Sequence, residues 1–141
     1  MEKLNVYLSN LAVLNAKFHN LHWNVVGKQF VQIHEFTESA YDTFFEQYDE
    51  VAELLKMRGL SPLVKLEDYL KNATVKELAS QDFSVKEVLD IVEGDFKLMM
   101  ELATEIRNEA DEANDFVVVA AFEGFVAGYQ KNLWFIKAIK A

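Results

Sequence analysis

Residues 30–58 read FVQIHEFTESAYDTFFEQYDEVAELLKMR, a segment that contains neither glycine nor proline. Apolar side chains recur along it at three- and four-residue spacing, which is typical of a helix with a buried face. Gly59 and Pro62 follow directly, so the helix is predicted to end at about residue 58. The row expected to face the core of its own chain consists of Ile33, Ala40, Phe44, Tyr48, Val51 and Leu55.

The same helix carries a second row of residues that is aromatic in its middle and has ligand-type side chains towards both ends. At about 100° per residue, these positions fall within roughly 80° of one another. A helix in a monomeric four-helix bundle needs only one buried face. The second row therefore predicts antiparallel packing against another copy of this helix across a twofold axis. Its members are His34, Glu38, Tyr41, Phe45, Asp49 and Ala52, with Glu53 at its border.

Three further long helices are predicted, at residues 4–25, 84–110 and 115–139. The sequence Ser84-Val85-Lys86-Glu87 matches a capping box, and Asn114 is a candidate cap for the last helix. Residues 63–83 form a long connection in which a short helix is expected at about 64–70. Four long helices with one long connection predict an all-α, ferritin-like four-helix bundle, built as a single domain over residues 1–141.

Composition excludes several classes of protein. With 141 residues and 51% hydrophobic content, the chain is long and apolar enough for one globular domain. The net charge of −9 and the absence of a basic tail argue against DNA binding. The absence of cysteine fits a cytoplasmic protein. The most apolar run, residues 116–129, includes Glu123 and is too short to cross a membrane.

The chemistry-bearing residues are three histidines, all between residues 19 and 34, and a pair of acidic residues, Asp49 and Glu53. Imidazole and carboxylate groups without cysteine form a ligand set for iron or zinc. His34 and Asp49 are fifteen residues apart, which is roughly 22 Å along a helix, so one helix cannot bring them to one ion. The Glu-x-x-His pattern of intrachain di-iron sites is absent.

Two copies of the helix, packed antiparallel, would solve this problem of distance. His22, His34 and Glu38 of one chain would then lie opposite Asp49 and Glu53 of the other, and a dimer would carry two equal sites. By themselves, Asp49 and Glu53 also fit a solvated helix face. His19 lies outside the ligand row and is expected to be a hydrogen-bonded core residue. For Trp23, simple packing and a role as a sink for oxidising equivalents both stay open.

Several short motifs, taken in their order along the chain, closely match the pattern of one protein family. These motifs are His19-Asn20-Leu21-His22-Trp23, Gly27, Phe30-Val31-Gln32-Ile33-His34-Glu35, Tyr41 and Asp49-Glu50-Val51-Ala52-Glu53, followed by Gly59-Leu60-Ser61-Pro62, Leu66-Glu67-Asp68-Tyr69-Leu70, Asn114-Asp115 and Trp134. This pattern resembles that of the Dps proteins, the mini-ferritins named for DNA protection in starved cells. The resemblance covers nearly the whole chain and is strongest from residue 15 to residue 70.

The resemblance implies an iron-storage protein of the cytoplasm, a hollow dodecamer that protects against oxidative stress. It would be a ferroxidase that oxidises Fe(II), with hydrogen peroxide preferred to oxygen, at di-iron sites between subunits. The implied metal ligands and catalytic residues are His22, His34 and Glu38 of one chain, with Asp49 and Glu53 of its mate. Glu38 stands where the family more often has aspartate, and Leu54 stands where it usually has arginine. DNA-binding members generally use a lysine-rich tail, which this chain lacks.

Two other functions remain open at this point. One is a structural or DNA-compacting assembly with weak or vestigial metal sites, and the other is a manganese or zinc protein on the same scaffold. The acidic residues Asp111, Glu112 and Asp115 are expected to open the last helix. They could serve its dipole, or they could line a threefold pore that draws cations into the cage.

Overall fold

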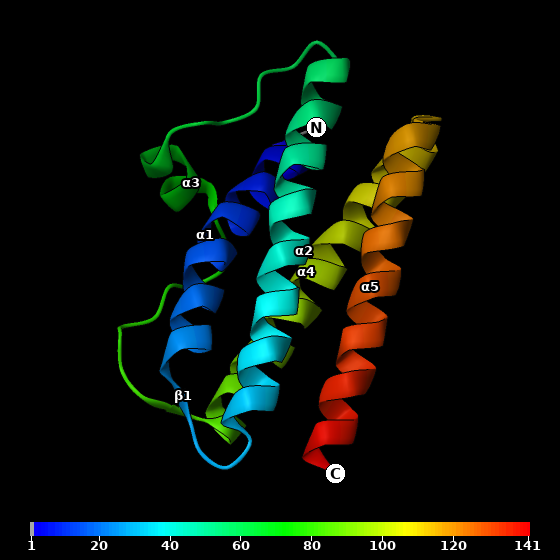
Figure 1. Ribbon diagram of the computed structural model, residues 1–141. Coiled ribbons are helices and arrows are strands. Elements are labelled where there is room, and N and C mark those ends of the chain that lie inside the picture. Colours follow the sequence, from blue (N-terminus) through cyan, green and yellow to red (C-terminus); the bar gives the residue numbers. More distant parts are fainter. Residues whose placement is uncertain (1) are drawn as a thin grey trace. The chain divides into compact units, whose positions relative to one another are not determined.

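A computed structural model describes residues 2–141 as two compact units, one up to Val88 and the other from Leu89 to the end. Within these residues four long helices and one short helix are present, as predicted (Figure 1). Two very short strands accompany them. In chain order the elements are α1 (Glu2–Asn24), β1 (Val25–Val26), α2 (Phe30–Met57), α3 (Leu66–Asn72), β2 (Phe83–Ser84), α4 (Val85–Glu112) and α5 (Phe116–Lys140).

In the first unit, α1 and α2 lie side by side and α3 packs against α1 (Figure 1). The rings of Phe18 and Phe44 meet edge to face, with centroids 5.0 Å apart, and so join the two long helices. The predicted core row of α2 is buried except at Tyr48, which is partly exposed. The second row is different, because Phe45 leaves 67% of its surface exposed within this chain.

Three asparagines of α1 hold the long connection after α2 in place. Asn5 bonds to Leu63 N–H and Ser61 carbonyl oxygen, and Asn20 donates to the carbonyl oxygens of residues 78 and 79. Between them, fully buried Asn10 accepts from the N–H groups of residues 74 and 75, at 2.7 and 3.2 Å. A segment with few regular hydrogen bonds of its own thus gains partners from α1.

A two-residue parallel ladder closes the end of the first unit where α1 meets α2. Val25 pairs with Phe83 and Val26 pairs with Ser84. Gly27 follows with a φ of 130°, a conformation that residues with a side chain rarely adopt. Ser84 caps α4 as predicted, because Glu87 N–H donates to Ser84 Oγ at 3.1 Å. The Glu87 carboxylate accepts from the Ser84 hydroxyl at 3.2 Å, whereas in the predicted capping box it would accept from the backbone N–H of Ser84.

In the second unit, α4 and α5 run antiparallel to each other. Lys140, near the end of α5, pairs with Asp90 near the start of α4. At the other end, Arg107 Nε lies 3.0 Å from the Glu123 carboxylate. The second unit contributes its own buried side chains, among them Val92, Phe96, Met99, Ile106, Val118 and Phe122. None of the helices within residues 2–141 combines the length and apolar character that a bilayer crossing requires.

The turn between α4 and α5 corrects two predictions. α4 continues to Glu112, so Asp111 and Glu112 close that helix and do not open α5. The cap of α5 is Asp115, whose carboxylate accepts from Val118 N–H at 3.4 Å. Asn114 is not the cap, because its φ of 57° places it in the left-handed turn between the helices. Asparagine tolerates that conformation, and this is the physical reason for its presence there.

Candidate metal centre

His22 and His34 lie face to face at the junction of α1 and α2. Their ring centroids are 3.6 Å apart and the ring planes differ by 15°. The Nδ1 atom of His22 is 2.6 Å from the backbone carbonyl oxygen of His34, and the Nδ1 atom of His34 is 2.8 Å from that of His22. Each ring is therefore held by the backbone of the residue that carries the other ring.

This reciprocal bonding fixes the chemistry of both rings. A carbonyl oxygen can only accept a hydrogen bond, so each Nδ1 atom carries a hydrogen and donates it. In a neutral imidazole the hydrogen then belongs to Nδ1, and the lone pair of Nε2 is free to bind a metal ion. Backbone carbonyl partners of this kind orient metal-binding histidines and set their tautomer.

Burial favours the neutral form of His22. Its side chain is 5% exposed, and desolvation lowers its pKa below the ordinary value of 6.5, because burial penalises the charged imidazolium. The positive charge that His34 and His19 can carry acts in the same direction, while the bond to the His34 carbonyl and the Glu38 carboxylate oppose it. Thr37 Oγ1 lies 3.2 Å from the same Nδ1 atom.

Tyr41 links Glu38 to the ring of His22. The carboxylate is exposed on α2, one turn after His34. The Tyr41 hydroxyl donates to Glu38 Oε1 at 3.4 Å, while the Tyr41 ring meets the His22 ring edge to face, with centroids 5.2 Å apart. Burial, followed by the charges of Glu38 and Asp42, raises the pKa of Tyr41, so its phenol stays protonated and able to donate.

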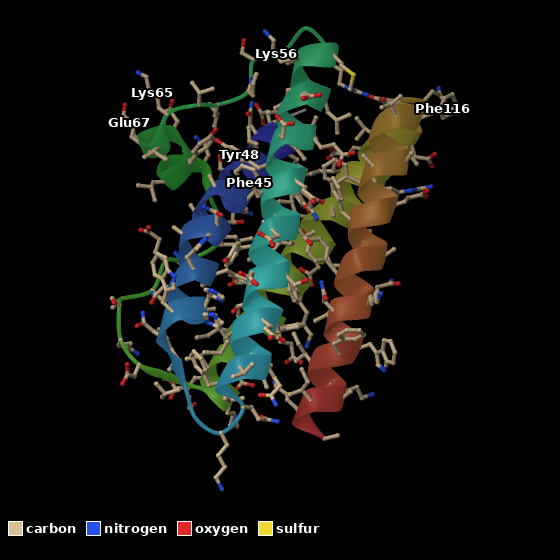
Figure 2. The ribbon with its side chains drawn as sticks, in the orientation of Figure 1. Phe45, Tyr48, Lys56, Lys65, Glu67 and Phe116 are labelled. Atoms are coloured by element: carbon tan, nitrogen blue, oxygen red, sulfur yellow. The ribbon has the colours of Figure 1, made fainter. Side chains whose placement is uncertain are left out.

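Asp49 and Glu53 are exposed on the far half of α2. Phe45 and Tyr48, labelled in Figure 2, lie on the stretch of α2 between Glu38 and this pair. Within residues 2–141, no three histidine or acidic side chains converge closely enough to hold a metal ion. One chain therefore brings together His22 and His34. Glu38 lies one turn after His34 on α2 without converging on the pair, and Asp49 and Glu53 lie farther along the helix.

His19 and Trp23 flank the candidate centre on α1. His19 is hydrogen-bonded, as expected, since its Nδ1 atom lies 2.6 Å from the Asn15 carbonyl oxygen, but it is only partly buried and so is not a core residue. Its ring stacks on Tyr41 with centroids 3.8 Å apart and is 5.4 Å from the ring of Trp23. Trp23 leaves 68% of its surface exposed, so packing within this chain does not account for it.

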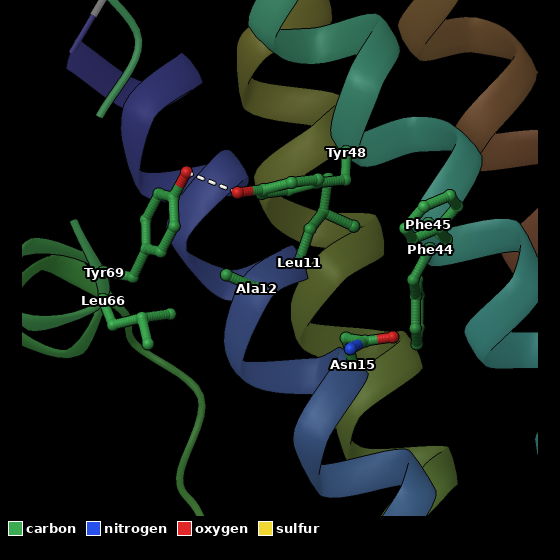
Figure 3. Close-up of a pocket in the computed structure, with 8 residues that line it drawn as sticks. All are labelled: Leu11, Ala12, Asn15, Phe44, Phe45, Tyr48, Leu66 and Tyr69. Atoms are coloured by element: carbon green, nitrogen blue, oxygen red, sulfur yellow. Dashed lines mark hydrogen bonds between the residues drawn. The ribbon is translucent and has the colours of Figure 1, made fainter. Parts of the chain in front are cut away.

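An apolar pocket of about 170 Å³ lies beside the second row of α2, in the first unit (Figure 3). The Tyr48 and Tyr69 hydroxyl oxygens are 2.6 Å apart, and Tyr69 donates onward to the Leu63 carbonyl oxygen at 2.7 Å. Burial and the bond to Tyr48 raise the pKa of Tyr69. The pocket is lined by Leu11, Ala12, Asn15, Phe44, Phe45, Tyr48, Leu66 and Tyr69.

The acidic residues considered for a pore do not share one environment. Asp111 lies 3.3 Å from Arg107, which also binds Glu123. Asp115 serves the start of α5, so the helix-dipole interpretation applies to it. Asp111 and Glu112 sit at the C-terminal end of α4, where a negative charge is unfavourable to the helix dipole.

For two residues near the site, the sequence did not predict the contacts that the structure shows. Thr37 is fully buried and donates to the carbonyl oxygens of Ile33 and His34, at 2.9 and 3.0 Å. Its position three residues after His34 was the only available signal. Tyr41 was predicted as a packing residue, yet it connects Glu38 with the histidines. Leu54, which stands where the family usually has arginine, is 2% exposed and is a core residue of this chain.

Comparison with known proteins identifies the family that shares this architecture. The ferritin-like domain family matches the chain over residues 1–140. The DNA protection during starvation protein of Helicobacter pylori is 34% identical over 126 residues, covering 89% of this chain and 88% of that protein. The crystal structure of Helicobacter cinaedi CAIP has a TM-score of 0.96 at 35% identity and covers 99% of this chain and 98% of its own.

A Dps protein from Bacillus brevis is also similar, with a TM-score of 0.94 at 32% identity, over 99% of this chain and 93% of that one. The class is thus the all-α, ferritin-like four-helix bundle with a short helix in its long connection, as the sequence predicted. Within that class, the chain belongs to the Dps family.

Proposed function

We propose that this protein binds Fe(II) and oxidises it to Fe(III) at di-iron sites shared by two chains, and stores the product. The observation that carries the proposal is the reciprocal bonding of His22 and His34, which leaves two stacked imidazoles with free Nε2 atoms. Glu38 beside them, with Asp49 and Glu53 of a second chain, supplies the carboxylates. Neutral imidazoles and hard carboxylates suit iron.

The reaction follows from these donors. Anionic carboxylates stabilise Fe(III) more than Fe(II), and few protein ligands per ion leave positions open for an oxidant. With hydrogen peroxide, each of two Fe(II) ions loses one electron, the O–O bond takes both, and two hydroxide ions form. Because both electrons arrive together, no hydroxyl radical is released. Oxygen is the second oxidant that we consider.

The proposal requires a homo-oligomer, and we propose a closed dodecamer in which residues 1–141 form one domain. Support comes from the second row of α2, where Phe45 is 67% exposed, and from α3, where Leu66 is 76% exposed. Exposed apolar residues that cluster in this way are typical of an interface. The cytoplasmic location suggested by the cysteine-free sequence belongs to the same proposal.

A direct test compares Asp49→Asn with Glu50→Gln. Both replace an exposed carboxylate of α2 by its amide, but Glu50 lies outside the ligand row. Anaerobic protein is loaded with two Fe(II) per chain, and oxidation by hydrogen peroxide is followed by absorbance. We expect Asp49→Asn to slow the reaction at least about tenfold, as for loss of a group that acts on the metal, and Glu50→Gln to match the parent. Equal rates in all three proteins would refute the site.

A DNA-compacting assembly is the second candidate, because relatives carry the name DNA protection during starvation protein. The net charge of −9 per chain opposes it, since DNA affinity depends on neutralising phosphates. We expect no gel shift of duplex DNA near neutral pH at physiological salt. A clear shift without added divalent cation would favour this candidate.

A zinc or manganese protein on the same scaffold is the third candidate, because imidazole and carboxylate groups also bind these ions. Competition between Fe(II) and Zn(II) for the site distinguishes an iron-oxidising protein from a zinc protein. Protein isolated without chelators is analysed for metal content, and Fe(II) oxidation is then measured with and without excess Zn(II). If the isolated protein holds tightly bound zinc that Fe(II) does not displace, iron oxidation is not its function.

For cation uptake we propose that Asp111, Glu112 and Asp115 gather around a threefold axis and line a pore. Asp111 and Glu112 face an unfavourable helix dipole, so a cation at this end of α4 would offset that cost. Asp111→Asn together with Asp115→Asn should slow iron uptake at low salt, and the effect should shrink as salt screens the charges. Uptake equal to that of the parent at low salt would mean that these residues serve only local structure.

A further inference from the structure

The apolar pocket of the first unit lies between α1, α2 and α3 (Figure 3). Its apolar lining consists of Leu11 and Ala12 from α1, Phe44 and Phe45 from α2, and Leu66 from α3. The volume of the pocket is about 170 Å³. An engineered protein cavity of roughly 150 Å³ with an apolar lining holds one benzene molecule. The pocket therefore has the size of one aromatic ring.

Hydrogen bonds on both sides of α3 keep this space open. Before α3, Asn5 of α1 accepts from the N–H of Leu63 at 2.9 Å, and the Tyr69 hydroxyl donates to the Leu63 carbonyl oxygen at 2.7 Å. After α3, buried Asn10 of α1 accepts two N–H bonds from the backbone that follows the helix. An apolar void costs free energy, but these bonds tie both flanks of α3 to α1. The pocket is therefore preformed, as most ligand sites are.

Three polar side chains share the lining, and they differ in what they can offer. The hydrogen of the Tyr69 hydroxyl is used on Leu63, so the 2.6 Å bond between the two phenols must be donated by Tyr48. The tyrosine pair therefore has no hydrogen left for a ligand. The Asn15 backbone carbonyl bonds to His19, whereas its side-chain amide makes no hydrogen bond within residues 2–141. Figure 3 shows Asn15 and the tyrosine pair on different sides of the pocket.

The lining favours a neutral ligand over a charged one. Of the described residues that line the pocket, none is acidic or basic. Burial, followed by the bond to Tyr48, raises the pKa of Tyr69, so its phenol stays neutral at physiological pH. A charged ligand would lose its water without gaining an opposite charge, which is costly.

We propose that this pocket binds a neutral, one-ring aromatic molecule that carries a hydroxyl group. The ring lies against the rings of Phe44 and Phe45, which favour an aromatic guest in edge-to-face or offset geometry. The hydroxyl bonds to the Asn15 amide, which can both donate and accept. Phe45 also belongs to the second row of α2, so a second chain packed there would shield the bound ligand from solvent.

The experiment uses fluorine NMR of three small probes with the metal-free protein in its native oligomeric state. The first probe is para-fluorophenol, and the second is para-fluorotoluene, which replaces the hydroxyl by a methyl group of similar size. The third, para-fluorobenzoate, is charged. Ala12→Leu fills the pocket, and the control Ala16→Leu makes the same change at an exposed position one turn later on α1, outside the lining. Asn15→Leu removes the amide at similar size.

We expect para-fluorophenol to bind the parent and Ala16→Leu equally and in a saturable way. Ala12→Leu should weaken it at least about tenfold, because the added carbons occupy the space of the ring. In the parent, para-fluorotoluene should bind about two- to tenfold more weakly than para-fluorophenol, as for the loss of one neutral hydrogen bond. That difference should disappear in Asn15→Leu, and para-fluorobenzoate should not compete.

Four results would overturn the proposal. They are unchanged binding in Ala12→Leu, equal binding of para-fluorophenol and para-fluorotoluene to the parent, tighter binding of para-fluorobenzoate, and no saturable binding to the parent. The last result would mean that side chains of a second chain fill the pocket in the oligomer. If Ala12→Leu does not fold, crystals of the parent soaked with para-bromophenol decide. Anomalous scattering should place the bromine between α1 and α3, and its absence there would overturn the proposal.

Discussion

The two ends of α2 are built in opposite ways. At the N-terminal end, His34 is fixed by the His22 carbonyl, and buried Thr37 bonds to the His34 carbonyl and lies against the His22 ring. At the far end, Asp49 and Glu53 are exposed, and no hydrogen bond to another side chain within residues 2–141 holds either of them. One helix thus carries an ordered half of the candidate centre and an open half.

Solvation explains the difference. A neutral imidazole can be buried at modest cost if its N–H finds a carbonyl, and both histidines satisfy this condition. A carboxylate is charged, and burying it without a cation is expensive. Asp49 and Glu53 accordingly lie exposed to water in this chain, and the proposed function requires a cation and a second chain to cover them. The four predictions below test this division, in order of decreasing effect.

The largest effect is expected from separating the two halves onto different chains. His34→Ala and Asp49→Ala should each abolish iron oxidation, and the double variant should be little worse than either. In mixed oligomers, random pairing across a twofold axis restores about a quarter of the sites, because only one of the two sites in a mixed dimer is intact. The measurement is the rate at which hydrogen peroxide oxidises Fe(II) after subunit exchange between the two variants has been verified. No recovery would mean that each site belongs to one chain.

The second prediction concerns the surface between the two halves. Phe45→Glu places a charge on the exposed apolar row and should break the oligomer into smaller species while each chain remains helical. Light scattering and circular dichroism report these two outcomes. The control is Thr43→Glu, also exposed but about 200° around the same helix, which should leave the assembly intact. A full-sized oligomer of Phe45→Glu would show that this row is not the interface.

The third prediction follows from the lowered pKa of His22. The unfolded imidazole takes up a proton at its ordinary pKa of 6.5, whereas the folded one does so only at lower pH. The unfolded chain thus binds more protons in this window, and stability falls as pH drops below about 6.5. Urea unfolding of metal-free protein at pH 7.5 and 5.5 measures this loss. It should be smaller in His22→Gln, and an equal loss in both proteins would contradict the shift.

The smallest effect is expected at Thr37. Thr37→Val keeps the shape of the side chain but removes the oxygen 3.2 Å from His22 Nδ1. The bond of that nitrogen to the His34 carbonyl remains, so the affinity for Co(II), used as a non-oxidising probe, should fall about tenfold at most. The control is Thr43→Val, whose exposed hydroxyl also donates to a carbonyl four residues earlier. A larger loss in the control would show that the change acts through the helix, not the histidine.

The helices could be predicted because they depend on local rules. Hydrophobic periodicity located α2, and the capping signal at Ser84 placed the start of α4 correctly. The last turn was predicted less well. Asn114 and Asp115 both favour caps, and only the left-handed φ of Asn114 shows that Asp115 performs that role.

The sequence by itself determined which residue types could hold iron and that one helix could not bring them together, because helical rise converts residue spacing into distance. Only the tertiary structure decided how the histidines are held. Their reciprocal bonds join backbone and ring atoms twelve positions apart, through a turn at Gly27 that no periodic pattern encodes. The β1–β2 ladder and the asparagines that fasten the long connection likewise join distant positions. Such contacts depend on where the chain returns in space, and local sequence carries no record of that.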